Sequence, residues 1–235
     1  MPYAPSKHVT GLDVALQEII ANILIGTAPT FPAIVREYCV AAGVFLAHAQ
    51  FENFFVDLVD SLARAYSSGR ADELPNRLRA YFFLKNSNLQ TTISLRIAGG
   101  SEHEFLDRTS STIAGPAKHF IDQSLPLPAL EGEDIHGEQS YPSTNNIKKV
   151  LKRIGVGDPA SELNKNIQAD AILLLESLAS LRTALAHAAS LPSISTADII
   201  KRIEGLHKFA TSFDKVIYAQ LVKTHSEASW HTYVA

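Results

Sequence analysis

The sequence predicts an all-α fold, an up-and-down helical bundle with one long early helix and additional short helices. Apolar residues recur at helical spacing through most of the chain, and no stretch alternates apolar and polar residues as a half-buried strand would. Proline and glycine fall mainly between these apolar runs. The chain has 235 residues, 46% of them hydrophobic, which suits a single globular domain over residues 1–235 with a substantial core.

The first two helices carry the clearest patterns. Apolar side chains follow one face over residues 9–25, with Thr10 and Asp13 as the expected capping pair. A second helix is expected over residues 32–66, which would span about 50 Å at 1.5 Å per residue. Its one glycine, Gly43, is the expected place for a kink. We expect this long helix to form the backbone of the bundle.

The middle of the chain is less regular. A third helix is expected over residues 76–97, and Ser101 with Glu104 would then cap weaker helical pieces. The segment 123–143 contains three prolines and two glycines and predicts a long flexible loop.

Three elements complete the predicted bundle. Residues 144–154 predict a short basic helix capped by Ser143 or Thr144. A longer helix is expected over residues 167–189, and a last helix, capped by Ser195 with Asp198, runs to about residue 223. The core is therefore expected over about residues 33–221, with a tail at 224–235 that packs on the bundle or on a partner.

Composition excludes several classes of protein. A formal net charge of -3 is incompatible with a nucleic-acid binder that relies on charge alone, although a local arginine cluster could still contact RNA. The single cysteine, Cys39, excludes a disulfide framework or a cysteine-based zinc site within one chain. The N-terminus lacks a signal-peptide pattern, and no run of about 18 uncharged apolar residues predicts a membrane span. We expect a soluble, cytoplasmic protein.

The helix over 167–189 contains the most informative motif. Residues 181–191 read LRTALAHAASL, so that Arg182 precedes His187 by five positions in an apolar, alanine-rich setting. Positions five apart on a helix lie about 140° apart, so the two side chains do not share a face. Spacing alone is also compatible with a surface arginine and a histidine favoured by the helix C-terminus.

The motif and its surroundings resemble one known family. RTALAH is similar to the Rx4–6H signature of the HEPN superfamily (higher eukaryotes and prokaryotes nucleotide-binding domains), here as Rx4H in the bacterial RiboL-PSP-HEPN/MAE-like type. Upstream, FLAHAQFENFFVDLVDSL resembles the early long helix of HEPN proteins, and SYPSTNNIKKVLKRIGV resembles the segment before their catalytic helix. The resemblance covers residues 33–221.

The resemblance implies a metal-independent endoribonuclease of toxin–antitoxin or antiviral defence type, with no cofactor. Arg182 and His187 would be catalytic, in a composite site where two protomers of a homodimer meet. Thr183 follows the arginine where the family usually has Asn, Asp or His, and would orient the imidazole. On the long helix, Glu52 would position Arg182 or His187; its neighbour His48 is equally well explained as a polar core pair with Glu52.

Partners follow from the same resemblance. RNA is the expected substrate, and its backbone would contact a basic patch on the short helix, which is otherwise a solvated face: Lys148, Lys149, Lys152 and Arg153. A cognate antitoxin is a possible protein partner, and no membrane is involved. Two alternatives remain open: a non-catalytic HEPN-like module that dimerises and binds nucleotide, RNA or a partner, and a helical adaptor in which the motif arose by chance.

Overall fold

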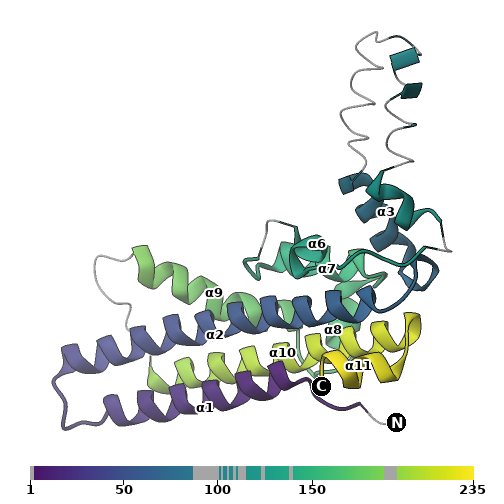
Figure 1. Ribbon diagram of the computed structural model, residues 1–235. Coiled ribbons are helices and arrows are strands. Elements are labelled where there is room, and N and C mark those ends of the chain that lie inside the picture. Colours follow the sequence, from purple (N-terminus) through teal and green to yellow (C-terminus); the bar gives the residue numbers. More distant parts are fainter. Residues whose placement is uncertain are drawn as a thin grey trace.

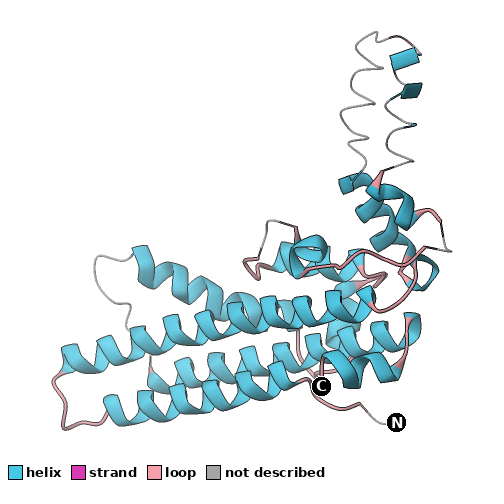
Figure 2. Ribbon diagram, viewed as in Figure 1, coloured by secondary structure: helices cyan, strands magenta, loops and turns pink. Residues whose placement is uncertain are grey.

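The computed structural model confirms the all-α prediction. It describes residues 3–86, 101, 103–104, 106–107, 110, 115–122, 125–137, 140–187 and 195–235, and these residues form helices and loops with no strand (Figure 2). The described elements are α1 (Lys7–Gly26), α2 (Ala33–Ser67), η1 (Ala71–Glu73), α3 (Asn76–Asn86), η2 (Pro116–Phe120), α6 (Gly132–His136), α7 (Thr144–Arg153), α8 (Pro159–Asn164), α9 (Ala171–His187), α10 (Thr196–Thr224) and α11 (Glu227–Tyr233).

The long helix α2 is the backbone of the bundle, as predicted. In Figure 1, α1 and α10 run along one side of α2, and α9 lies on another side and diverges from α2 toward its own C-terminal end. Aromatic side chains fill the space between α2 and α10, with Phe51 against Phe209 and Phe54 against Phe213 at ring-centroid distances of 5.8 and 6.4 Å. Burial of these large rings stabilises the bundle.

The hairpin of α1 and α2 is closely packed because glycines lie at two of its contacts. A Cβ atom on Gly26 would come within 2.5 Å of the Cys39 sulfur, and one on Gly43 within 2.4 Å of a buried Ile23 methyl group. The α-helix continues uninterrupted through Gly43. The absence of a side chain at Gly43 therefore lets α1 approach α2.

The start of α1 differs from the prediction. Ser6, rather than Thr10 with Asp13, caps the helix: its hydroxyl accepts a hydrogen bond from the Val9 N–H at 3.0 Å. Thr10 lies inside the helix and donates its hydroxyl proton to the Ser6 carbonyl. Sequence alone could not separate two hydroxyl residues four positions apart, each followed by a helical pattern.

Both ends of the chain pack on the bundle. Asp214, buried on α10, accepts hydrogen bonds from the Tyr3 hydroxyl at 2.7 Å and from the Ser6 N–H at 3.0 Å. The tail forms α11, whose buried Trp230 donates to the Ala4 carbonyl at 2.9 Å. The tail is thus part of the core, and so is α1, which the expected core of 33–221 left out.

The middle of the chain contains one helix that the sequence did not predict. Within the expected loop 123–143, α6 forms over Gly132–His136, and the Gly132 N–H donates to an Asp60 carboxylate oxygen of α2 at 2.7 Å. The expected third helix is seen as α3, and its predicted continuation to residue 97 lies outside the described residues. The Ser101 cap is confirmed by a hydrogen bond from the Glu104 N–H.

Helices α7, α9 and α10 lie close to their predicted ranges. Ser143 caps α7 and Ser195 caps α10, each through its hydroxyl oxygen. Helix α9 begins four residues later than expected, after Asp170 has accepted hydrogen bonds from the Ile172 and Leu173 N–H groups. These capping signals were readable because they are local in the sequence.

Two of the described helices, α1 and α2, are long and apolar enough to cross a membrane by length and composition alone, each with at most two charged residues in the most apolar window. The prediction of no membrane span considered only runs without any charged residue, whereas these windows contain up to two. Core helices of soluble proteins pass the same test, and the chain folds as a soluble-type helical domain.

Substitution of Gly43 tests the close packing of α1 on α2. Gly43→Leu should lower the free energy of unfolding by about 1–3 kcal/mol, because the new side chain must displace buried Ile23. Gly11→Ala is the control, since a Cβ on Gly11 meets nothing within 4 Å; it should raise stability by about 0.5–1 kcal/mol through helix propensity. Urea unfolding measures both. Equal effects of the two variants would contradict the close contact.

Candidate functional site

The candidate site lies where α9 packs beside α2. Arg182 is half-buried and in line with Leu178 and Leu175, four and seven positions earlier, on the packed face of α9. Across from it on α2, the buried His48 contacts Glu52 one turn later, with its Nδ1 atom 3.1 Å from a carboxylate oxygen. The positive charge of Arg182 is close enough to act on the His48 imidazole.

A third segment completes this cluster. Tyr141, in the loop before α7, places its hydroxyl 3.2 Å from His48 Nε2, and the two rings stack at a centroid distance of 5.4 Å. Asn146 holds this loop by donating from its side-chain amide to the Tyr141 carbonyl at 2.8 Å. Tyr141 was not among the residues predicted from the sequence. It lies 93 positions from His48, in a segment that was predicted to be a flexible loop.

The electrostatics of the cluster favour a neutral imidazole. Burial lowers the pKa of His48 below its ordinary value, and the nearby positive charge of Arg182 lowers it further. Glu52 acts in the opposite direction, through its negative charge and its hydrogen bond, without overcoming burial. His48 is consequently neutral near pH 7 and can accept a proton.

The other motif residues face elsewhere. His187 is the last residue of α9, exposed and about 140° around the helix from Arg182. Thr183 is exposed and donates its hydroxyl proton to the Ala179 carbonyl at 3.0 Å, within its own helix. Within one chain, then, the charge of Arg182 acts on His48, whereas His187 is exposed at the end of the helix.

The basic helix α7 presents two kinds of side chain. Arg153 is engaged inside the fold: one guanidinium nitrogen donates to the Ile135 carbonyl at 2.6 Å, and the group lies 3.9 Å from the centre of the Tyr81 ring. Lys152 is exposed, and Lys148 and Lys149 are half-buried. The N-terminal end of α7 contacts α9, where Thr144 donates to Glu176 at 2.9 Å.

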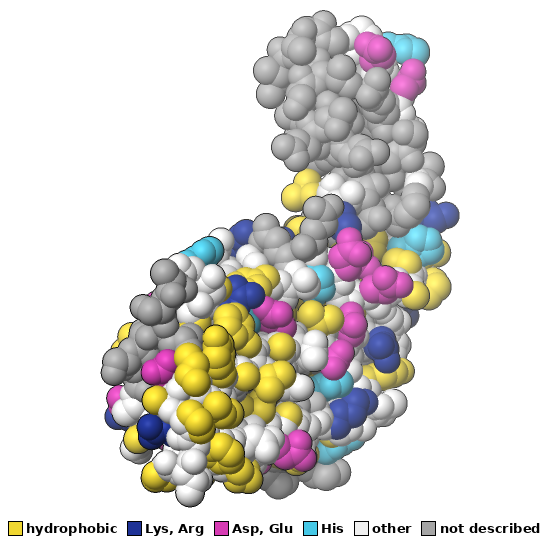
Figure 3. Space-filling model, turned by 90° about the vertical axis from the view of Figure 1, so that its left-hand side faces the viewer, with side chains coloured by type: hydrophobic (Ala, Val, Ile, Leu, Met, Phe, Trp, Pro, Cys, Tyr) yellow, Lys and Arg dark blue, Asp and Glu magenta, His cyan; other side chains and the backbone are white. Residues whose placement is uncertain are grey.

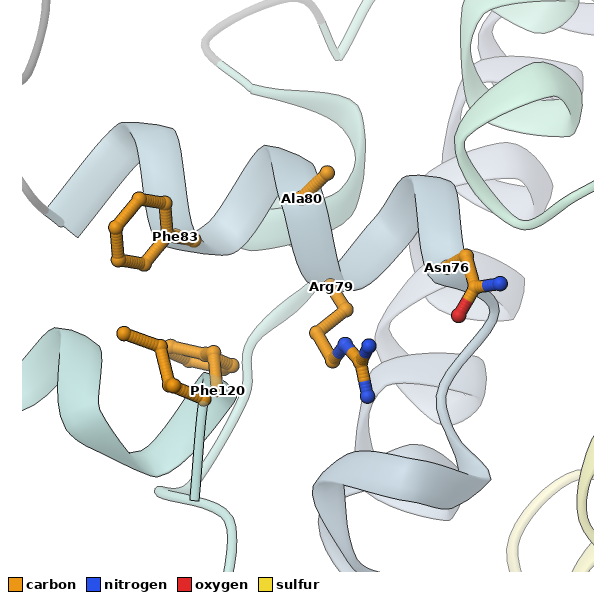
Figure 4. Close-up of a pocket in the computed structure, with 6 residues that line it drawn as sticks. Asn76, Arg79, Ala80, Phe83 and Phe120 are labelled. Atoms are coloured by element: carbon orange, nitrogen blue, oxygen red, sulfur yellow. The ribbon is translucent and has the colours of Figure 1, made fainter. Parts of the chain in front are cut away.

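A separate pocket of about 290 Å³ lies beside α3 and η2, at the other end of α2 from the C-terminal end of α9 (Figure 1). Figure 4 shows Phe83 and Phe120 facing each other across it, with Arg79 and Asn76 on the same helix as Phe83. None of the predicted site residues lines this pocket.

Among the described residues, no group of three or more His, Cys, Asp and Glu side chains could hold a metal ion. His48 and Glu52 are the nearest approach to such a site, and their other neighbours are a phenol and a guanidinium. The donor set of the described cluster thus suits proton transfer and anion binding rather than metal coordination.

Comparison with known families agrees with the all-α fold and with the family resemblance. The family model described as RiboL-PSP-HEPN matches residues 13–219, which is most of the chain. The chain belongs to the RiboL-PSP-HEPN family. HEPN domains often have ribonuclease or nucleotide-binding roles and commonly form dimers and bind RNA. No curated protein and no solved structure matches the chain.

The pKa of His48 tests the geometry of this HEPN cluster directly. Arg182→Gln should raise it, because a repelling positive charge is removed, and Glu52→Gln should lower it, because a stabilising negative charge is removed. Titration of the imidazole by NMR measures both shifts. Lys208→Gln, an exposed change on α10, is the control and should leave the pKa unchanged. No response to Arg182→Gln would place the guanidinium away from His48.

Proposed function

We propose that this HEPN protein is a metal-independent endoribonuclease that cleaves RNA by attack of the substrate's own 2′-hydroxyl. The observation that carries the proposal is the cluster beside α2 and α9, where the buried His48 contacts Glu52 and Tyr141 and the positive charge of Arg182 acts on its imidazole. Membership of a family whose domains often act on RNA supports the same chemistry.

The chemistry needs three contributions. A base removes the proton of the 2′-hydroxyl, a cation stabilises the additional negative charge on the phosphate, and an acid protonates the departing 5′-oxygen. Arg182 suits the second role, since a guanidinium binds phosphate oxygens through paired hydrogen bonds. His187 suits proton transfer, because its imidazole is exposed at the end of α9 and its ring nitrogens can donate and accept a proton. The products are a 2′,3′-cyclic phosphate and a 5′-hydroxyl.

A homodimer follows from the surface of α2 in this proposal. Ile34, Tyr38 and Phe45 are 53%, 64% and 39% exposed and recur at helical spacing along one stripe, which continues toward His48 and Glu52. Figure 3 shows apolar side chains gathered on the face at this end of the molecule. A second copy that covers the stripe would extend the interface to the site, and would offer its His187 to the Arg182 of the first protomer.

A non-catalytic HEPN module is the second candidate. It is favoured by the exposed Thr183, which directs its proton into its own helix, and by the separation of Arg182 and His187 around α9. Such a module would bind RNA or a protein partner without cleavage. For the enzyme, a toxin–antitoxin or defence role in the cytoplasm, with a cognate antitoxin as partner, completes our proposal.

Replacement of the motif residues separates the two candidates. His187→Ala should reduce RNA cleavage by about 10²- to 10⁴-fold through loss of a proton-transfer group. Arg182→Ala should reduce it by about 10²- to 10³-fold through loss of charge stabilisation. His231→Ala, which removes an exposed histidine of α11, is the control and should retain full activity. Gel analysis of product ends from a labelled RNA measures the rates. Undiminished cleavage by pure His187→Ala protein would remove His187 from the mechanism.

Disruption of the apolar stripe tests the dimer. Tyr38→Asp should convert the protein to a monomer and lower RNA cleavage with it, because a charge cannot be buried in an apolar contact without a large cost. Leu84→Asp is the matched control, since Leu84 is 54% exposed on α3 at the other end of α2. Sedimentation equilibrium measures the mass of each variant. A dimer that persists in Tyr38→Asp would place the interface elsewhere.

A further inference from the structure

Three side chains from two segments form a continuous hydrogen-bonded row at the site. Glu52 lies 3.1 Å from His48 Nδ1, and the Tyr141 hydroxyl lies 3.2 Å from His48 Nε2. Both ring nitrogens are thus occupied, one by a carboxylate and one by a phenol. The neutral imidazole satisfies both contacts when its proton is on Nδ1. Nδ1–H then donates a hydrogen bond to Glu52, and Nε2 accepts a hydrogen bond from the Tyr141 hydroxyl.

The row connects the protein interior to solvent. His48 is buried, Glu52 is partly exposed, and Tyr141 is 40% exposed at the surface end. The charged groups that act on His48 are Glu52 on its own helix and Arg182 on α9, while Tyr141 faces it from the loop. A ligand at the surface of this cluster would therefore reach Tyr141 or Glu52 before the buried imidazole.

Tyr141 is also held in place from both sides. Its ring stacks on His48, and Asn146 of α7 binds its carbonyl oxygen. The same end of α7 is attached to α9 through the hydrogen bond from Thr144 to Glu176. The phenol is thus positioned by α2, α7 and α9 together, which favours a role that needs a fixed geometry.

We propose that Tyr141, backed by His48 and Glu52, is the proton acceptor for the 2′-hydroxyl of RNA. This inference rests on the proposed nuclease function. The 2′-hydroxyl gives its proton to the Tyr141 oxygen as Tyr141 gives its own proton to His48 Nε2, and the 2′-oxygen forms its bond to phosphorus. The imidazolium that results is stabilised by Glu52, and the bond from phosphorus to the 5′-oxygen breaks.

This proton relay from Tyr141 to His48, stabilised by Glu52, supplies a proton-transfer group that one Arg–His motif lacks. Cleavage needs one base and one acid, and each motif supplies one histidine. With Tyr141, His48 and Glu52 as the base, His187 of the second protomer is available to protonate the departing 5′-oxygen, and Arg182 of the first protomer stabilises the phosphate. The division also gives each histidine the environment its role requires, buried and neutral for His48 and exposed for His187.

The test is the pH dependence of RNA cleavage by the full-length protein and its variants. Tyr141→Phe keeps the stacked ring and removes only the hydroxyl; it should lower kcat by about 10²-fold with little change in KM. The acidic limb of the profile reports the pKa of His48 in this scheme. It should move to higher pH, because the neutral imidazole has lost the hydrogen bond from Tyr141 that stabilised it. Glu52→Gln should move the same limb to lower pH.

Tyr233→Phe, on α11, is the matched control and should behave as wild type. The ¹⁵N shifts of His48 in the same proteins, measured without RNA, should show the proton on Nδ1 and a raised pKa in Tyr141→Phe. Cleavage by Tyr141→Phe at the wild-type rate with an unmoved profile overturns the relay and leaves the nuclease proposal standing. A wild-type protein that cleaves no RNA overturns both.

Discussion

The packing of α9 against α2 is the contact on which the site depends. It buries one face of α9, and Arg182 lies in line with that face, half-buried and close enough for its positive charge to act on His48. The same packing desolvates His48, which keeps the imidazole neutral beside a permanent cation. An arginine on the opposite face of α9 would leave His48 with Glu52 and Tyr141 but without a nearby cation.

Much of the bundle could be predicted from the sequence because its signals are local. The apolar pattern of the packed face of α2, the Ser195 cap of α10 and the basic α7 each depend on residues a few positions apart. The errors have a physical cause as well. Ser6, and not Thr10, caps α1 because its backbone N–H is bound by Asp214 of α10. Helix α6 is bound by Asp60 of α2, which lies more than seventy positions away in the sequence.

The site could be predicted only in part, because some of its contacts join residues that are far apart in the sequence. The residues 48 and 52 share a helical face, and their pairing followed from spacing alone. The contact of Tyr141 with His48 joins a loop to a helix 93 positions earlier, and no local pattern encodes it. The motif was found through family resemblance, and helical geometry then explained why Arg182 and His187 lie in different environments of one chain.

The separation of Arg182 and His187 in one chain is the reason why we propose a homodimer. One protomer presents a half-buried arginine, Arg182, and an exposed histidine at the end of the same helix. A partner across the apolar stripe of α2 can supply the missing histidine in each direction. Two-fold symmetry would then yield two equivalent sites from one contact.

The most direct measurement of the central claim uses the substrate rather than the protein. An RNA that the protein cleaves is compared with the same oligonucleotide carrying a single 2′-deoxynucleotide immediately 5′ of the scissile phosphate. Our account predicts that the RNA yields 2′,3′-cyclic phosphate and 5′-hydroxyl ends and that the modified strand stays intact at that bond. Cleavage of both strands at the same bond would contradict attack by the 2′-hydroxyl.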